Sequence, residues 1–187
     1  MVEVVRRPGH VRSVSHRTGR IAAPPAAVWP WLVQMGFDRG GWYALDVLER
    51  AAGVGRFATG GSARRVEPTL QHLAVGDRVP LSRRAWLEVT VLEPPSRLEL
   101  RLPPGRFGWT WRFDLTPLDD PDGRAGEGAS RLTITTELDV PARRPLAAAG
   151  VTAGLVAFDV GHGLMERVQL RTLARRVPGT GGGEAPR

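Results

Sequence analysis

The stretch GWTWRFDLTPL, residues 108–118, alternates apolar and polar side chains along its whole length. Its apolar side carries Trp109, Trp111, Phe113 and Leu115. A period of two is typical of a β-strand that buries one face and leaves the other in water. The stretch therefore predicts a half-buried strand whose inner face is strongly aromatic.

Three further stretches repeat this period: WLEVTVLE at 86–93, LELRL at 98–102 and LTITTEL at 132–138. Pro94-Pro95 and the turn-rich loop 119–129 separate them. Successive strands joined by turns form an antiparallel meander. A weaker alternation over residues 11–21 predicts a polar edge strand ahead of it.

Helical patterns flank the meander. Pro24-Pro25 opens a first short helix that Gly36 closes, and residues 43–52 predict a second one. Residues 146–177 predict a single long helix at the C-terminus. This order predicts an α+β fold, in which a curved antiparallel sheet wraps around the long helix and two short helices follow the first strand.

The composition indicates one domain over residues 10–177, with a flexible segment at 1–9 and a disordered tail, PGTGGGEAPR, at 178–187. The glycine-rich segment 53–73 has no clean period. It is either a mobile lid, with Phe57 closing a cavity, or an ordinary surface loop with Phe57 pinned into the core.

Residue usage excludes several chemistries. The chain has 26 positively charged residues, all arginine, and a net charge of +7, but the arginines are scattered among acidic residues, so we expect no nucleic-acid partner. The absence of lysine and cysteine excludes Schiff bases, thiolate nucleophiles and disulfides. The four histidines lack metal-ligand spacing, and we expect neither metal nor cofactor.

The N-terminal residues MVEVVRRPGH lack the apolar core of a signal peptide, so we expect none, and the weakly polar run 146–158 is expected to be too short to span a bilayer. A cytoplasmic location is the expectation. The oligomeric state stays open.

Several segments resemble the START-like, or SRPBCC, helix-grip superfamily, in particular its bacterial polyketide cyclase- and dehydratase-like group. They are PPAAVWPWLVQMGFDRGGWYALDVLER (24–50), LAVGD (73–77), VTVLEPPSRLEL (89–100), WTWRFDL (109–115), SRLTITTEL (130–138) and MERVQLRTLARR (165–176). The resemblance implies a helix-grip fold that encloses a small, largely apolar, polyketide- or lipid-like molecule. It leaves open whether the protein is an enzyme or a carrier or sensor, since no catalytic signature carries over.

The aromatic residues suggest where that molecule binds. Indole and phenol rings offer broad apolar area with one polar atom each. The predicted binding residues are Trp42, Tyr43, Trp86, Trp109, Trp111, Phe158, Asp159 and Met165. Alternatively, Trp109 and Trp111 pack beneath the final helix without leaving a cavity.

The final helix also carries an imidazole and a carboxylate on its sheet-facing stripe. His162 and Glu166 are four residues apart, so their side chains can touch. They are the candidate catalytic pair, with Glu166 orienting His162 for proton transfer. The alternatives are contact with a polar ligand group, mutual satisfaction at a cavity mouth, or a salt bridge from Glu166 to a strand arginine such as Arg112.

Overall fold

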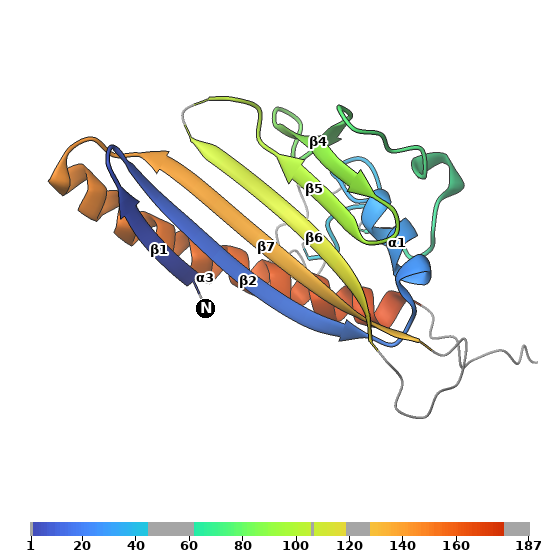
Figure 1. Cartoon of the computed structure of the whole chain (residues 1–187). Coiled ribbons are helices and arrows are strands. Elements are labelled where there is room, and N and C mark those ends of the chain that lie inside the picture. Colours follow the sequence, from blue (N-terminus) through green and yellow to red (C-terminus); the bar gives the residue numbers. More distant parts are fainter. Residues whose placement is uncertain (1, 45–61, 106, 119–127, 178–187) are drawn as a thin grey trace, which may run out of the picture.

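The computed structural model describes residues 2–44, 62–105, 107–118 and 128–177. Seven strands form one antiparallel sheet in the order β1-β2-β7-β6-β5-β4-β3 (Figure 1). The strands are β1 (Val2–Arg7), β2 (His10–Ile21), β3 (Arg78–Pro80), β4 (Trp86–Glu93), β5 (Arg97–Arg101), β6 (Gly108–Leu118) and β7 (Ala129–Pro141). The expected meander is β4 to β7, and its strand bounds agree closely with the sequence periods.

Helix α3 (Pro145–Arg176) runs along one face of the sheet and packs against β1, β2 and β7 (Figure 1). Helix α1 (Pro25–Val33) contacts the same sheet over β6 and β7. A single turn of 3-10 helix, Pro68–Leu70, lies in the segment that leads to β3. This arrangement confirms the expected helix-grip α+β fold.

The core lies between the sheet and these helices. Trp111, Phe113 and Leu115 of β6 and Leu132 and Ile134 of β7 are all buried there. The registers Trp111↔Thr136 and Phe113↔Ile134 place these side chains next to each other on one face. The period of two therefore predicted both where these strands lie in the sequence and which of their faces is buried.

The N-terminal segment corrects one expectation. Residues 1–9 were expected to be loose, but Val2–Arg7 form β1, which pairs with β2 from Val2↔Ser15 to Arg7↔His10. The reason is a hairpin: Gly9 has a φ of 76°, which glycine adopts readily, and reverses the chain. As a result β2 lies between β1 and β7, and the expected edge strand at 11–21 is an interior strand.

Other expectations fall partly outside the described residues. Tyr43 and Ala44 are not helical, and the rest of the expected second helix lies beyond the part of the chain that the structure describes. The same holds for residues 53–61 of the expected lid, Phe57 among them, and for the tail 178–187, whereas residues 62–73 are described.

Helix α3 is long and apolar enough, by length and composition, to cross a membrane. The expectation that this part of the chain is too short to span a bilayer concerned the run 146–158 alone, whereas the whole of α3 extends to Arg176. One side of α3 nevertheless packs against the sheet, where Leu155, Leu170 and Leu173 are buried.

Candidate ligand-binding site

A cavity of about 370 Å³ lies between the inner face of the sheet and the middle of α3. Its lining is Trp42, Leu81, Trp109, Trp111, Phe158, Gly161, His162 and Met165. Within the described part of the chain, no charged side chain lines it. The gap between sheet and helix is thus not filled by side chains at this point.

Local periodicity explains how these residues meet. Trp109 and Trp111 are two apart on β6 and so point to the same face. Phe158, His162 and Met165 are three or four apart on α3 and so share one side of the helix. Trp42 arrives from the segment after α1 and stacks on Trp111, with ring centroids 5.1 Å apart.

His162 is enclosed by aromatic rings. Its imidazole meets Trp109 and Trp111 edge-on, at centroid distances of 5.5 and 5.2 Å. Phe158 lies 4.9 Å from it on the same helix. These contacts fix the imidazole plane at the wall of the cavity.

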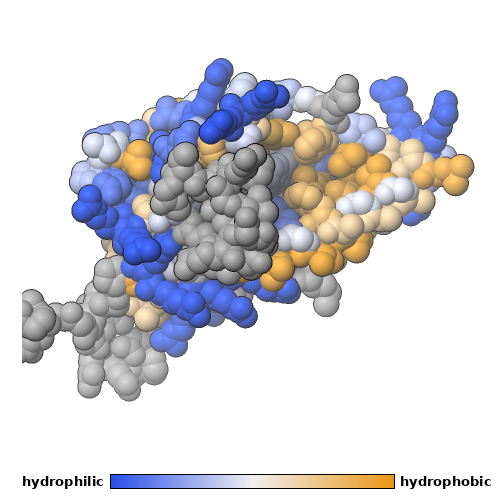
Figure 2. Space-filling model, turned by 180° about the vertical axis from the view of Figure 1, so that it is seen from behind, coloured by the Kyte–Doolittle hydropathy of each residue, from blue (hydrophilic) through white to orange (hydrophobic). Residues whose placement is uncertain are grey.

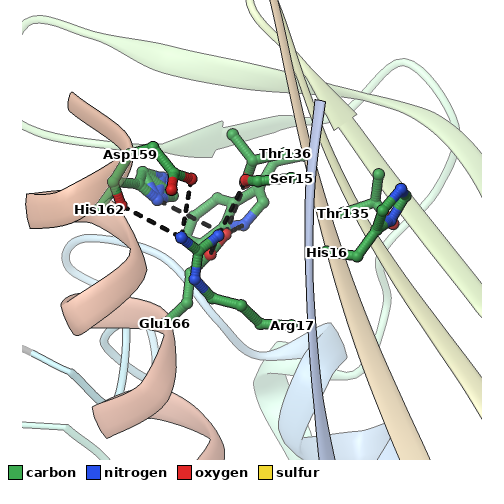
Figure 3. A network of polar contacts seen from close by, with 9 residues as sticks. Ser15, His16, Arg17, Thr135, Thr136, Asp159, His162 and Glu166 are labelled. Carbon is green, nitrogen blue, oxygen red and sulfur yellow. Dashed lines mark hydrogen bonds and ion pairs between the residues drawn. The ribbon is translucent and has the colours of Figure 1, made fainter. Parts of the chain in front are cut away.

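A network of buried charges lies beside the cavity, between β2 and α3 (Figure 3). Arg17 extends from β2 and donates to Asp159 at 2.7 Å and to Ser15 at 2.8 Å. Nη1, the nitrogen that donates to Ser15, also forms an ion pair with Glu166 at 2.9 Å. The side chain of Arg17 is only 10% exposed, so these interactions occur away from water.

Gly163 makes room for this network. The Arg17 guanidinium passes directly over Gly163, and a Cβ at that position would collide with it. Glycine in the middle of a helix costs up to about 1 kcal/mol relative to alanine. Here the close approach of Arg17 to the helix backbone requires it.

Glu166 is fully buried, and two hydrogen-bond donors and one guanidinium converge on its carboxylate. Trp111 Nε1 donates to Oε1 at 3.0 Å, and the Thr136 hydroxyl donates to the same oxygen at 2.5 Å. Arg17 occupies Oε2. Glu166 therefore links β6 and β7 to α3. The strand arginine that pairs with Glu166 is Arg17 and not the expected Arg112, which pairs with Asp114.

His162 and Glu166 are brought together but do not form a hydrogen bond. Nδ1 of His162 lies 3.5 Å from Oε1 of Glu166, which is already occupied by Trp111 and Thr136. Among the described residues, neither imidazole nitrogen has a hydrogen-bond partner. Glu166 is therefore not arranged to orient His162.

The surroundings shift the pKa of all three titratable groups. Burial, together with the positive charge of Arg17, lowers the pKa of His162 from 6.5 to about 4, so the imidazole is neutral near pH 7. Burial raises the pKa of Glu166, against the opposing effects of Thr136, Arg17 and Trp111. Burial also disfavours ionised Asp159, but hydrogen bonds from Arg17 and Ser15 outweigh it and lower its pKa.

Three of the predicted binding residues lie elsewhere. Tyr43 is fully buried away from the cavity, and its hydroxyl accepts a 2.7 Å hydrogen bond from Gln34. Trp86 is 36% exposed and lies under the Arg78 guanidinium. The alternation along β4 already indicated that Trp86 faces away from the side on which Leu87 is buried. Asp159 binds Arg17 and does not line the cavity.

Sequence reasoning missed Leu81, Gly161 and Arg17. Arg17 follows Ser13 and Ser15 on the inward side of β2, so the period of two was a usable signal. Residues 11–21 were expected to form a polar edge strand, so an inward role for Arg17 was not predicted. Nothing in the local sequence marks Leu81 or Gly161 as a cavity residue.

A second hollow, of about 460 Å³, lies where the β1–β2 hairpin meets the start of β6. Its lining mixes apolar and charged side chains, among them the Arg12–Glu137 ion pair at 2.6 Å and the His10–Asp139 hydrogen bond at 3.1 Å. Across the described residues, no three His, Asp or Glu side chains gather as metal ligands would. The apolar cavity is therefore the better candidate for a small-molecule site.

No protein-family model matches the chain, and no curated protein matches its sequence. Solved structures resemble it in shape. Truncated norcoclaurine synthase from Thalictrum flavum is 11% identical, the match covers 89% of this chain and 96% of the synthase, and the TM-score is 0.49. CalU16 from Micromonospora echinospora is 15% identical over 94% of this chain and 93% of its own, with a TM-score of 0.35.

A Mesorhizobium loti protein is 18% identical over 87% of this chain and 97% of its own, with a TM-score of 0.44. At such identities the likeness concerns general shape only. The chain's own strand order and its long final helix carry the assignment. By that topology the chain is a helix-grip protein.

Proposed function

We propose that this protein binds a small, largely apolar and uncharged molecule in the cavity between β6 and α3. The observation that carries the proposal is the aromatic lining of a space of about 370 Å³. Sites for small organic molecules are usually apolar hollows of roughly 300–1,000 Å³ with a few polar groups. A charged ligand would lose its hydration there without a charged side chain to replace it.

His162 is the residue that would fix the orientation of the ligand. A neutral imidazole offers one donor and one acceptor. Its nitrogens have no partner among the described residues, so a hydroxyl or carbonyl group of the ligand would compete with no existing bond. The indole rings of Trp109 and Trp111 would supply most of the contact area.

Cavity filling tests the proposal with a matched control. N-phenyl-1-naphthylamine is a neutral apolar probe whose fluorescence rises when it leaves water. Gly161 lines the cavity, whereas Gly154 lies earlier on α3 and does not line it. A Cβ at either position meets open space, so Gly154 can serve as the control. Gly161→Phe should weaken probe binding about tenfold or more, whereas Gly154→Phe should leave it unchanged. Equal affinity in both variants, or no binding to the parent protein, would contradict the proposal.

A cyclase- or dehydratase-like enzyme is the second candidate, favoured by the unpaired imidazole at the cavity wall. With its pKa near 4, His162 is a weak general base at neutral pH, which favours the binding role. Mass spectrometry of copurifying small molecules would supply the ligand. His162→Gln would then separate the candidates: lost turnover at unchanged affinity indicates an enzyme, and a loss of affinity alone indicates a carrier. For both candidates we keep the expected cytoplasmic location.

A further inference from the structure

The side of α3 that faces away from the sheet is apolar over most of its length. This outer stripe consists of Leu146, Ala153, Ala157, Val160 and Leu164, which fall on one line along the helix. Leu146 is 89% exposed, Val160 70% and Leu164 53%. Figure 2 shows apolar side chains gathered on the side of the molecule where α3 begins. Contiguous exposed apolar surface of this kind marks an interaction site more often than isolated apolar residues do.

Positive charges stand at both ends of the outer stripe. Arg143 and Arg144 immediately precede α3, and both are exposed. Beyond Leu164 the same line continues with Arg167, Arg171 and Arg175, which are also exposed. The stripe is thus a continuous apolar surface between two groups of cations.

No negative charge on the helix balances them. The acidic residues within α3 are Asp159 and Glu166, and both point towards the sheet, where they bind Arg17 (Figure 3). Among the residues that the structure describes, the outer side of the helix therefore presents apolar surface and arginines without a carboxylate partner.

We propose that the outer stripe of α3 docks on an anionic lipid surface. An apolar stripe can enter the boundary between headgroups and acyl chains, while arginine side chains reach the phosphates beside it. Each basic residue near such a surface adds to the attraction. The helix would lie along the surface and not cross it, because its other side is bound to β2 through Arg17 and Glu166.

Charge also argues against a second copy of the chain as the occupant. If two outer stripes packed in parallel, Arg167 and Arg171 would face their own copies. If they packed antiparallel, Arg143 and Arg144 would face Arg167 and Arg171. Like charges meet in both arrangements with no carboxylate between them, and the whole chain carries a net charge of +7.

Vesicle co-sedimentation tests the proposal on the full chain. The vesicles are pure phosphatidylcholine, or phosphatidylcholine with about one third phosphatidylglycerol. We expect the parent protein to bind the anionic vesicles and not the neutral ones. Val160→Glu should reduce that binding about tenfold or more, because it places a carboxylate in the apolar stripe.

Val75→Glu is the matched control. Val75 is 63% exposed, close to the value for Val160, and lies before β3 and away from α3. It should bind anionic vesicles like the parent, and circular dichroism should show both variants folded. The proposal is overturned if the parent does not bind, if Val160→Glu binds as well as Val75→Glu, or if the parent is a dimer that Val160→Glu dissociates.

Discussion

Removing the imidazole of His162 should change how the stability of the protein depends on pH. The pKa of His162 is about 4 in the folded chain and 6.5 as the ordinary value, so between these values the unfolded chain binds more protons than the folded one. Stability is then fully present above about pH 6.5 and is lost as the pH falls towards 4. The full shift corresponds to about 3 kcal/mol, of which about 2 kcal/mol is lost between about pH 7 and pH 4.5.

His162→Phe is the variant of choice, because both imidazole nitrogens lack partners among the described residues and a phenyl ring suits the surrounding rings. Asp159, Glu166 and Arg17, the charged groups that face His162, stay in place. The difference between parent and variant therefore isolates the imidazole.

The assay is urea denaturation of both proteins at about pH 7 and pH 4.5, with tryptophan fluorescence as the signal that reports unfolding. We expect the free energy of unfolding of the parent to fall by about 2 kcal/mol more than that of the variant. Equal falls in the two proteins would refute the reasoning, since His162 would then be protonated as easily in the folded chain as in the unfolded one.

Two further changes probe the network beneath the cavity. Gly163→Ala should displace the Arg17 guanidinium and lower the free energy of unfolding, measured by urea denaturation, by about 2 kcal/mol or more. Gly154→Ala is the control: its Cβ meets open space, so it should raise the free energy of unfolding by up to about 1 kcal/mol. Trp111→Phe keeps an aromatic ring but removes the donor to Glu166, so it should cost about 1–3 kcal/mol; an unchanged denaturation midpoint would show that the hydrogen bond contributes little.

Much of the fold followed from the period of hydrophobic residues. The bounds of β6 agree with the sequence expectation at both ends, and α3 is displaced by a single residue. The hairpin of β1 was missed although Pro8-Gly9 is a typical turn pair. The six residues of β1, VEVVRR, alternate too briefly to give a clear periodic signal, and pairing with β2 fixes the strand.

The site was harder to derive than the fold. Periodicity predicted the faces on which Trp109, Trp111 and Phe158 lie, and these three residues line the cavity. Trp86 was included for its aromatic character, although its alternation pointed outward. The contact of Arg17 with Asp159 spans 142 residues, and no local pattern reveals which turn of a helix meets which residue of a strand.

The passage of Arg17 over Gly163 has a consequence for recognising related proteins. The helix residues that surround it form the pattern Asp159-x-x-His162-Gly163-x-x-Glu166, in which Asp159, Gly163 and Glu166 touch the arginine and His162 supplies the imidazole beside it. A genome search for this pattern, with an arginine about 140 residues upstream on a strand, would collect chains that share the same buried charges even where overall identity is too low to align them. Among helix-grip chains that lie outside this pattern, a residue larger than glycine at the position of Gly163 should occur together with loss of the arginine.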